Sequence, residues 1–174
     1  MLWAIPIGIV VGLGLRGRLD GLANLGFRWA PLAVVGLLVQ VVLFTPFGDR
    51  LAGDLGPAIY VASTAAVFVA VVRNWRLAGL PLVAAGALSN LVAIVSNGGA
   101  MPADPGALAL AGFGGPGDHT NSVVLADPAF WVLTDIFALP AWLPMANVFS
   151  VGDVLIGIGV AVAIAAAMRR QVPA

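Results

Sequence analysis

The sequence predicts an all-α fold, a polytopic bundle of helices in a membrane, from three observations. The chain of 174 residues is 61% hydrophobic and only 9% charged, whereas soluble domains average about 25% charged residues. Its mean hydropathy is +1.05. Its apolar residues also gather in runs close to the ~17–25 residues that a crossing helix needs. We therefore expect a single transmembrane domain over residues 1–174, with about five crossings and a re-entrant or interfacial segment before the last helix.

The first apolar run covers residues 2–15 and would measure ~21 Å as a helix, less than a ~30 Å hydrocarbon core. Its positive charges, Arg16 and Arg18, follow the run, whereas a cleaved signal peptide carries them in front. We expect a retained first helix with its N-terminus outside. Residues 16–29 then leave two alternatives open, an interfacial helix with leucines at helical spacing or an ordinary polar loop.

Three further spans are predicted at residues 30–47, 57–72 and 80–96, joined by short loops. A few polar residues lie inside them, including Gln40, Ser89 and Asn90. Hydrogen bonds between neighbouring helices are the usual reason for polar groups in such spans. Small residues at 84–89, and Gly159, Ala163 and Ala167 in the last helix, would let helix backbones approach closely.

Residues 97–129 interrupt this pattern with a segment rich in Gly and Pro that also contains the only histidine, His119. Irregular backbone has unsatisfied polar groups and must lie in water or against protein. We expect an extracytoplasmic loop, and loops of this length are usually functional or disordered. His119 is either a general base or ligand, or a solvated loop residue.

The arginines predict the orientation of the bundle. With residues 16–29, residues 73–79 and the C-terminal tail in the cytoplasm, Arg50 is the one arginine of the eight that lies outside. This satisfies the positive-inside rule only if residues 130–149 do not cross completely. Pro140 and Pro144 disfavour a helix there as well. The chain is then a multi-pass protein of a bacterial inner membrane, with its N-terminus outside and its C-terminus in the cytoplasm.

Two carboxylates, Asp135 and Asp153, lie in apolar sequence on either side of this segment. Ionisable groups at membrane depth are costly and are therefore candidates for function. Two carboxyls in one site of low dielectric constant cannot both ionise cheaply, so one tends to hold a proton while the other acts as a base. The alternatives are that Asp153 belongs to the cap of the last helix, begun by Ser150, and that Asp135 reaches water at the interface beside Trp131 and Trp142.

Short motifs in the C-terminal half resemble those of signal peptidase II, a four-helix aspartyl protease of the inner membrane. They are Gly86-Ala87-Leu88-Ser89-Asn90-Leu91, Leu133-Thr134-Asp135-Ile136-Phe137 and Phe149-Ser150-Val151-Gly152-Asp153. The resemblance implies that Asp135 and Asp153 form a catalytic pair at the outer surface. It also implies that Asn97 and Gly98 echo a substrate-binding motif. The arginine that meets the substrate in that family is replaced by Ile94, which argues against a lipoprotein substrate.

As a whole, the sequence resembles an uncharacterised family of small bacterial membrane proteins. Members share the pattern N-G-G-x-M-P, found here at residues 97–102, and F-S-x-G-D, found here at residues 149–153. The activity of that family is unknown, so this resemblance implies a common fold and leaves the function open.

Two functional hypotheses follow. In the first, the chain is an intramembrane aspartyl hydrolase that cleaves a membrane-inserted peptide, with Asp135 and Asp153 as the catalytic pair. Its substrate-binding candidates are Asn90, Asn97, Gly98, His119 and Ser150. In the second, it is a non-catalytic membrane scaffold or small-molecule-binding module. A proton-coupled transporter is a weaker third, because such relays lie near the membrane midplane.

Composition excludes several other classes of function. A net charge of zero argues against a nucleic-acid partner, which would require a clustered basic patch. A chain without cysteine has no thiolate nucleophile and no zinc-thiolate site. We expect no metal and no cofactor, and the lipid bilayer as the main partner.

Overall fold

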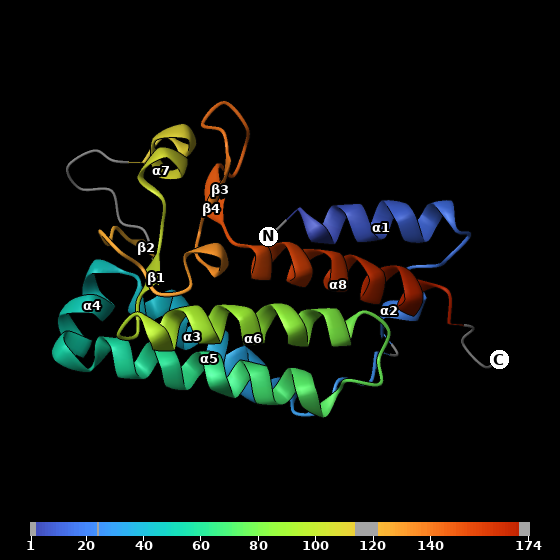
Figure 1. Ribbon diagram of the computed structural model, residues 1–174. Coiled ribbons are helices and arrows are strands. Elements are labelled where there is room, and N and C mark those ends of the chain that lie inside the picture. Colours follow the sequence, from blue (N-terminus) through green and yellow to red (C-terminus); the bar gives the residue numbers. More distant parts are fainter. Residues whose placement is uncertain (1–2, 24, 114–121, 171–174) are drawn as a thin grey trace.

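Five apolar helices lie side by side in the computed structural model, which describes residues 3–23, 25–113 and 122–170. Successive helices of this set run in opposite directions along the bundle (Figure 1). They are α1 (Ala4–Gly14), α3 (Ala30–Leu43), α5 (Gly56–Arg73), α6 (Leu80–Ser96) and α8 (Val151–Met168). The predicted spans at residues 57–72 and 80–96 thus form helices, and so does most of the run at residues 2–15.

Helix α8 lies between α1 and α6, and the remaining helices continue from α6 through α5 to α3 (Figure 1). Small residues make the two contacts of α8 possible. A methyl group at Gly86 of α6 would meet the main chain at Gly152, and one at Gly8 of α1 would lie 3.0 Å from the Cα of Ala161. Close backbone approach at small residues is the usual way in which apolar helices pack in a membrane.

Two helical stretches are long and apolar enough to cross a membrane, Pro46–Arg73 and Val151–Met168. Helices α1, α3 and α6 are apolar but shorter. The first stretch includes α4 (Pro46–Ala52) and the 3₁₀ turn η1 (Gly53–Leu55), which precede α5. Five complete crossings therefore stay a prediction.

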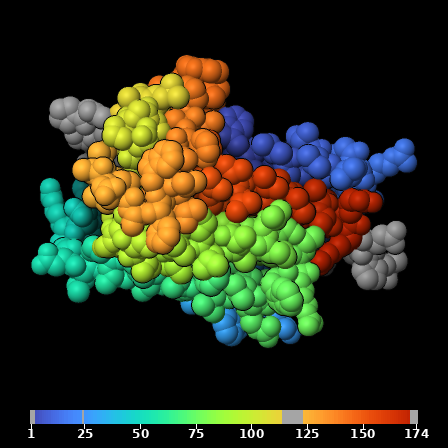
Figure 2. Space-filling model, in the orientation of Figure 1, coloured from blue at the N-terminus to red at the C-terminus, as the bar shows by residue number. Residues whose placement is uncertain are grey.

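A smaller layer, which we call the end subdomain (residues 97–113 and 122–149), covers one end of the bundle (Figure 2). It contains a short helix, a 3₁₀ turn and four short strands, namely β1 (Met101–Pro102), α7 (Pro105–Ala111), β2 (Ser122–Val123), η2 (Trp131–Leu133), β3 (Phe137–Leu139) and β4 (Asn147–Phe149). Strands β1 and β2 pair in parallel, and β3 and β4 pair antiparallel with Phe137 opposite Phe149. The expectation of an all-α fold was wrong in this region.

The physical reason for the strands lies in the prolines. Pro140 and Pro144 each remove a helical hydrogen bond, and both fall between β3 and β4. Residues 137–139 and 147–149 instead pair with one another across a hairpin. The prediction that this segment does not form a crossing helix is confirmed.

Three predicted boundaries need correction. In residues 16–29 the only helix among the described residues is α2 (Asp20–Ala23), so a polar loop describes this segment better than an interfacial helix. The span predicted at residues 30–47 ends at Leu43, because Thr45 caps a separate helix, α4, by accepting a hydrogen bond from the Gly48 amide at 3.0 Å. The loop at residues 97–129 contains α7, which Asp104 caps through the Ala107 amide at 2.9 Å.

The end subdomain shares a buried core with the bundle. Ile94, Met101 and Tyr60 are all less than a tenth exposed and pack together, with Leu133 against them. Because these residues come from two helices, β1 and η2, the core joins the subdomain to the helices that carry it.

Candidate functional site

Three of the predicted site residues, Asn90, Ser150 and Asp153, meet where the second half of α6 lies beside the start of α8. The Asn90 amide nitrogen donates to Oδ1 of Asp153 at 3.0 Å, and the Ser150 hydroxyl donates to Oδ1 of Asn90 at 2.8 Å. The Asp153 amide donates to the Ser150 hydroxyl at 3.0 Å, and the Ser150 amide donates to Oδ2 of Asp153 at 3.1 Å. We call this closed ring of hydrogen bonds the polar clasp.

The local sequence explains the clasp. Ser150 is the N-cap of α8, and Asp153 completes a capping box, which satisfies amide groups that have no partner inside the helix. A methyl group at Gly152 would collide with the Asn90 side chain. Glycine at this position therefore admits the amide from α6. The prediction that α8 begins at Ser150 with Asp153 in its first turn is confirmed.

The clasp already uses both carboxylate oxygens of Asp153 as acceptors. Ser150 is fully buried, and its hydroxyl both donates and accepts within the ring. Buried polar groups that satisfy one another in this way fix a single packing arrangement. The observed geometry suits a structural role for Asp153.

Asp135 lies in the end subdomain, beside β1. Its amide donates to the Pro102 carbonyl at 3.0 Å, and its carbonyl accepts from the Asp104 amide at 3.0 Å. The residue is 4% exposed, so it is enclosed by protein and does not reach water at the interface as one prediction had it. Trp131 and Trp142, its predicted companions at the interface, are 54% and 80% exposed.

The hairpin relates the two aspartates. Phe137 pairs with Phe149. Asp135 lies two residues before Phe137, and Asp153 lies four residues after Phe149. Both therefore belong to the same end of the β3–β4 ladder. A water shared by the two carboxyl groups stays a prediction.

Asn97 and Gly98 lie at the end of α6, about two helical turns beyond Asn90. The Asn97 amide nitrogen donates to the carbonyls of Ala93 and Ala129 at 2.7 and 3.0 Å, and its oxygen accepts from the Ala129 amide at 2.9 Å. Asn97 thus anchors the segment that leads to Asp135. Gly98 has a φ of +71°, which continues the chain away from the helix, and open space surrounds it.

His119 lies outside the described residues. Within residues 3–23, 25–113 and 122–170, no three His, Cys, Asp or Glu side chains gather as a metal site would require.

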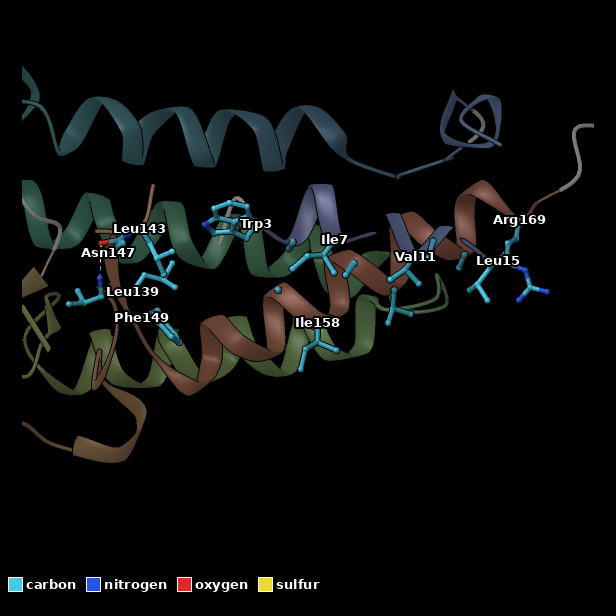
Figure 3. A pocket seen from close by; sticks show the side chains of 17 residues that line it. Trp3, Ile7, Val11, Leu15, Leu139, Leu143, Asn147, Phe149, Ile158 and Arg169 are labelled. Carbon is cyan, nitrogen blue, oxygen red and sulfur yellow. Dashed lines mark hydrogen bonds between the residues drawn. The ribbon is translucent and has the colours of Figure 1, made fainter. Parts of the chain in front are cut away.

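A feature that the sequence did not reveal is an apolar groove of about 870 Å³ between α1, α8 and the β3–β4 hairpin. Trp3, Leu139, Leu143 and Asn147 lie toward its hairpin end, and Leu15 and Arg169 lie at the other (Figure 3). Of its lining residues, only Asn147 and Arg169 are polar, and neither Asp135 nor Asp153 is among them.

A pattern in the sequence does correspond to this groove. Ile7 and Val11 of α1 and Leu15 directly after it recur every four residues, as Gly157, Ala161 and Ala165 do on α8. Each set marks one helix face. Sequence alone does not show that the two faces meet, because the helices are separated by most of the chain.

Comparison with protein families finds one match, over residues 24–165, to the model described as Family of unknown function (DUF5317). The chain belongs to this family, as the resemblance to an uncharacterised family predicted. No curated protein and no solved structure matches the chain. The resemblance to signal peptidase II gains no support from these comparisons.

Proposed function

We propose that this member of the DUF5317 family is a non-catalytic integral membrane protein that binds a long apolar molecule in the groove between α1 and α8. The observation that carries the proposal is the groove itself, whose volume of about 870 Å³ lies within the ~300–1,000 Å³ of ordinary ligand sites. It is the second of the two hypotheses raised by the sequence.

Membrane insertion is supported by the outer faces of the helices. Large apolar side chains such as Val35, Leu38 and Val41 of α3 are more than half exposed. A helix whose exposed face is as apolar as its packed face is typical of a lipid environment. The Pro46–Arg73 and Val151–Met168 stretches are also long and apolar enough to cross a membrane.

The alternating helices support the proposed orientation. Arg50 lies in α4, at the end of the bundle that carries the end subdomain. Arg73 ends α5 at the opposite end, where Arg16 and Arg18 follow α1 and Arg169 follows α8 (Figure 1). The positive-inside rule then assigns the end subdomain to the outer surface.

Two exposed tryptophans test this orientation in a chain without cysteine. Trp142 is 80% exposed in the end subdomain and Trp75 is 60% exposed at the other end of the bundle. We expect Trp142→Cys to react with an impermeant maleimide added outside intact cells, and Trp75→Cys to react only after lysis. The reverse pattern would contradict the orientation.

The competing hypothesis of an aspartyl hydrolase is favoured by one observation, the placement of Asp135 and Asp153 at the same end of the β3–β4 ladder. It is weakened by the enclosure of Asp135 and by the two hydrogen bonds that hold Asp153. Cleavage of membrane peptides by the wild type but not by an Asp135→Asn/Asp153→Asn variant would favour it over the binding proposal.

The binding proposal is tested by photolabelling with an uncharged photoreactive fatty alcohol in detergent. Val162 lines the groove and is 42% exposed, while Val154 lies on the same helix outside the groove and is 38% exposed. Val162→Trp fills the groove, and Val154→Trp is the matched control.

We expect labelled peptides from α1, α8 and the hairpin in the wild type and in Val154→Trp. Labelling should fall about tenfold in Val162→Trp, the effect of losing ~1.4 kcal/mol of binding. Equal labelling of both variants would contradict the proposal, as would label concentrated around Asp135.

A further inference from the structure

Among the described residues that line the groove, one has a charged side chain, and it lies at one end. Arg169 follows the last residue of α8 and is exposed, and within the described residues it forms no ion pair. The single ion pair found there joins Arg18 to Asp20 at 3.1 Å. Arg169 is thus a cation at one end of the apolar groove, where it is available to an anionic group of a ligand.

The groove follows the whole length of α8. Phe149, just before this 18-residue helix, and Arg169, just after it, both line the groove, and 18 residues of α-helix span ~27 Å. The groove is therefore about as long as a ~30 Å hydrocarbon core is thick. An acyl chain that starts at Arg169 has apolar walls along its full length.

The geometry points to a membrane phospholipid with a net negative headgroup as the occupant, an inference that rests on the proposed function. One acyl chain lies along α1 and α8 and extends from Arg169 toward the hairpin. The phosphate lies at the guanidinium of Arg169, whose planar set of donors suits a phosphate oxygen pair. In the proposed orientation this lipid belongs to the cytoplasmic leaflet, where anionic headgroups face juxtamembrane arginines.

Asn147 fits the same arrangement. It is exposed at the hairpin end of the groove, and its side-chain oxygen accepts a hydrogen bond from the Val148 amide at 2.9 Å. A carboxamide is a weaker partner for phosphate than a guanidinium. The stronger phosphate partner is therefore at the Arg169 end of the groove, and the lipid headgroup is oriented toward it.

The neighbouring Arg170 supplies a matched control, because it is also exposed but does not line the groove. We would measure bound lipid by native mass spectrometry of the delipidated full chain in detergent. The probes are phosphatidylglycerol and phosphatidylcholine with identical acyl chains. The wild type and Arg170→Gln should prefer phosphatidylglycerol. In Arg169→Gln the ratio of bound phosphatidylglycerol to bound phosphatidylcholine should fall about fivefold, the effect of one arginine beside an anionic lipid.

Failure of this inference and failure of the proposed function give different results. If Arg169→Gln keeps the wild-type preference while Val162→Trp loses both lipids, the groove binds lipid chains but Arg169 does not select the headgroup, and the inference is overturned. If Val162→Trp binds both lipids as Val154→Trp does, the groove proposal itself fails. Displacement of phosphatidylglycerol by inorganic phosphate alone would show that the acyl chain does not hold the ligand, and would also overturn the inference.

Discussion

Helix α8 packs against two neighbours in different ways. One contact holds the bundle together, and the other borders the proposed binding groove. Toward α6 it makes close glycine contacts and is held by the polar clasp of Asn90, Ser150 and Asp153. Toward α1 it makes close contacts at small residues without such a clasp, and a groove remains beside them. A polar group in an apolar environment fixes a partner strongly when satisfied. The packing of α8 against α6 is therefore fixed by hydrogen bonds, whereas the groove beside α1 leaves the space that the proposed ligand needs.

The chain that follows α1 is also attached to the C-terminal end of α8. The Arg18 amide donates to the Met168 carbonyl at 2.7 Å, and Gly21 of α2 approaches the Ala167 carbonyl closely. At the hairpin end, Trp3 and Asn147 line the groove (Figure 3). This attachment therefore lies at the end of the groove opposite the hairpin.

The largest expected effect comes from breaking the α6 side at Gly152. A side chain there would collide with the Asn90 side chain and the Gly86 carbonyl, so Gly152→Val should cost about 3 kcal/mol or more through overpacking and loss of the clasp. Gly14→Val is the control, because nothing lies within 4 Å of its added methyl group. Unfolding free energies measured by steric trapping would compare the two. Equal stability would show that α6 and α8 pack less closely than described.

A smaller loss distinguishes the structural reading of Asp153 from the catalytic one. Ser150→Ala should cost about 2 kcal/mol, since it removes an N-cap worth ~1 kcal/mol and leaves the Asn90 oxygen without its donor. Asp153→Asn keeps one acceptor oxygen and should cost about 1 kcal/mol. Thermal unfolding of both variants in detergent shows which of the two substitutions lowers the stability more. A catalytic pair predicts instead that Asp153→Asn leaves stability unchanged or raised.

A loss as small as that of Asp153→Asn is expected on the α1 side, at Gly12. A side chain there meets first the sulfur of Met168, which is the flexible end of its chain and repacks readily. We expect Gly12→Leu to cost about 1 kcal/mol, measured as for Gly152→Val. A loss as large as that of Gly152→Val would mean that the two sides of α8 are equally rigid.

The helices were predictable because their apolar runs are long and are bounded by Arg, Gly and Pro. The start of α8 was predictable because Ser150 and Asp153 form a local signal whose partners are three residues apart. The strands were not, because β3 and β4 are three residues each and their pairing depends on a turn through Pro140 and Pro144. For Ser150 and Asp153 the sequence offered both a catalytic and a capping role, and the structure shows the cap, whereas the sequence did not predict that Asn90 joins them.

The clasp and the groove illustrate what sequence leaves open. Asn90 lies 63 residues before Asp153, and their hydrogen bond depends on how α6 and α8 cross at Gly86 and Gly152. The groove depends in the same way on the meeting of α1 with α8 at Gly8 and Ala161. Long-range packing determines both, so their members appear in the sequence only as unconnected polar or small residues.

The most direct test of the account is the amount of lipid that remains bound to purified protein, measured by native mass spectrometry on two variants in parallel. One is Asp135→Asn/Asp153→Asn, which removes the carboxylates and leaves the groove intact. The other is Val162→Trp, which fills the groove and leaves the carboxylates intact. We predict that the first retains lipid as the wild type does and that the second loses it. Loss of lipid from the first with retention by the second would contradict the account.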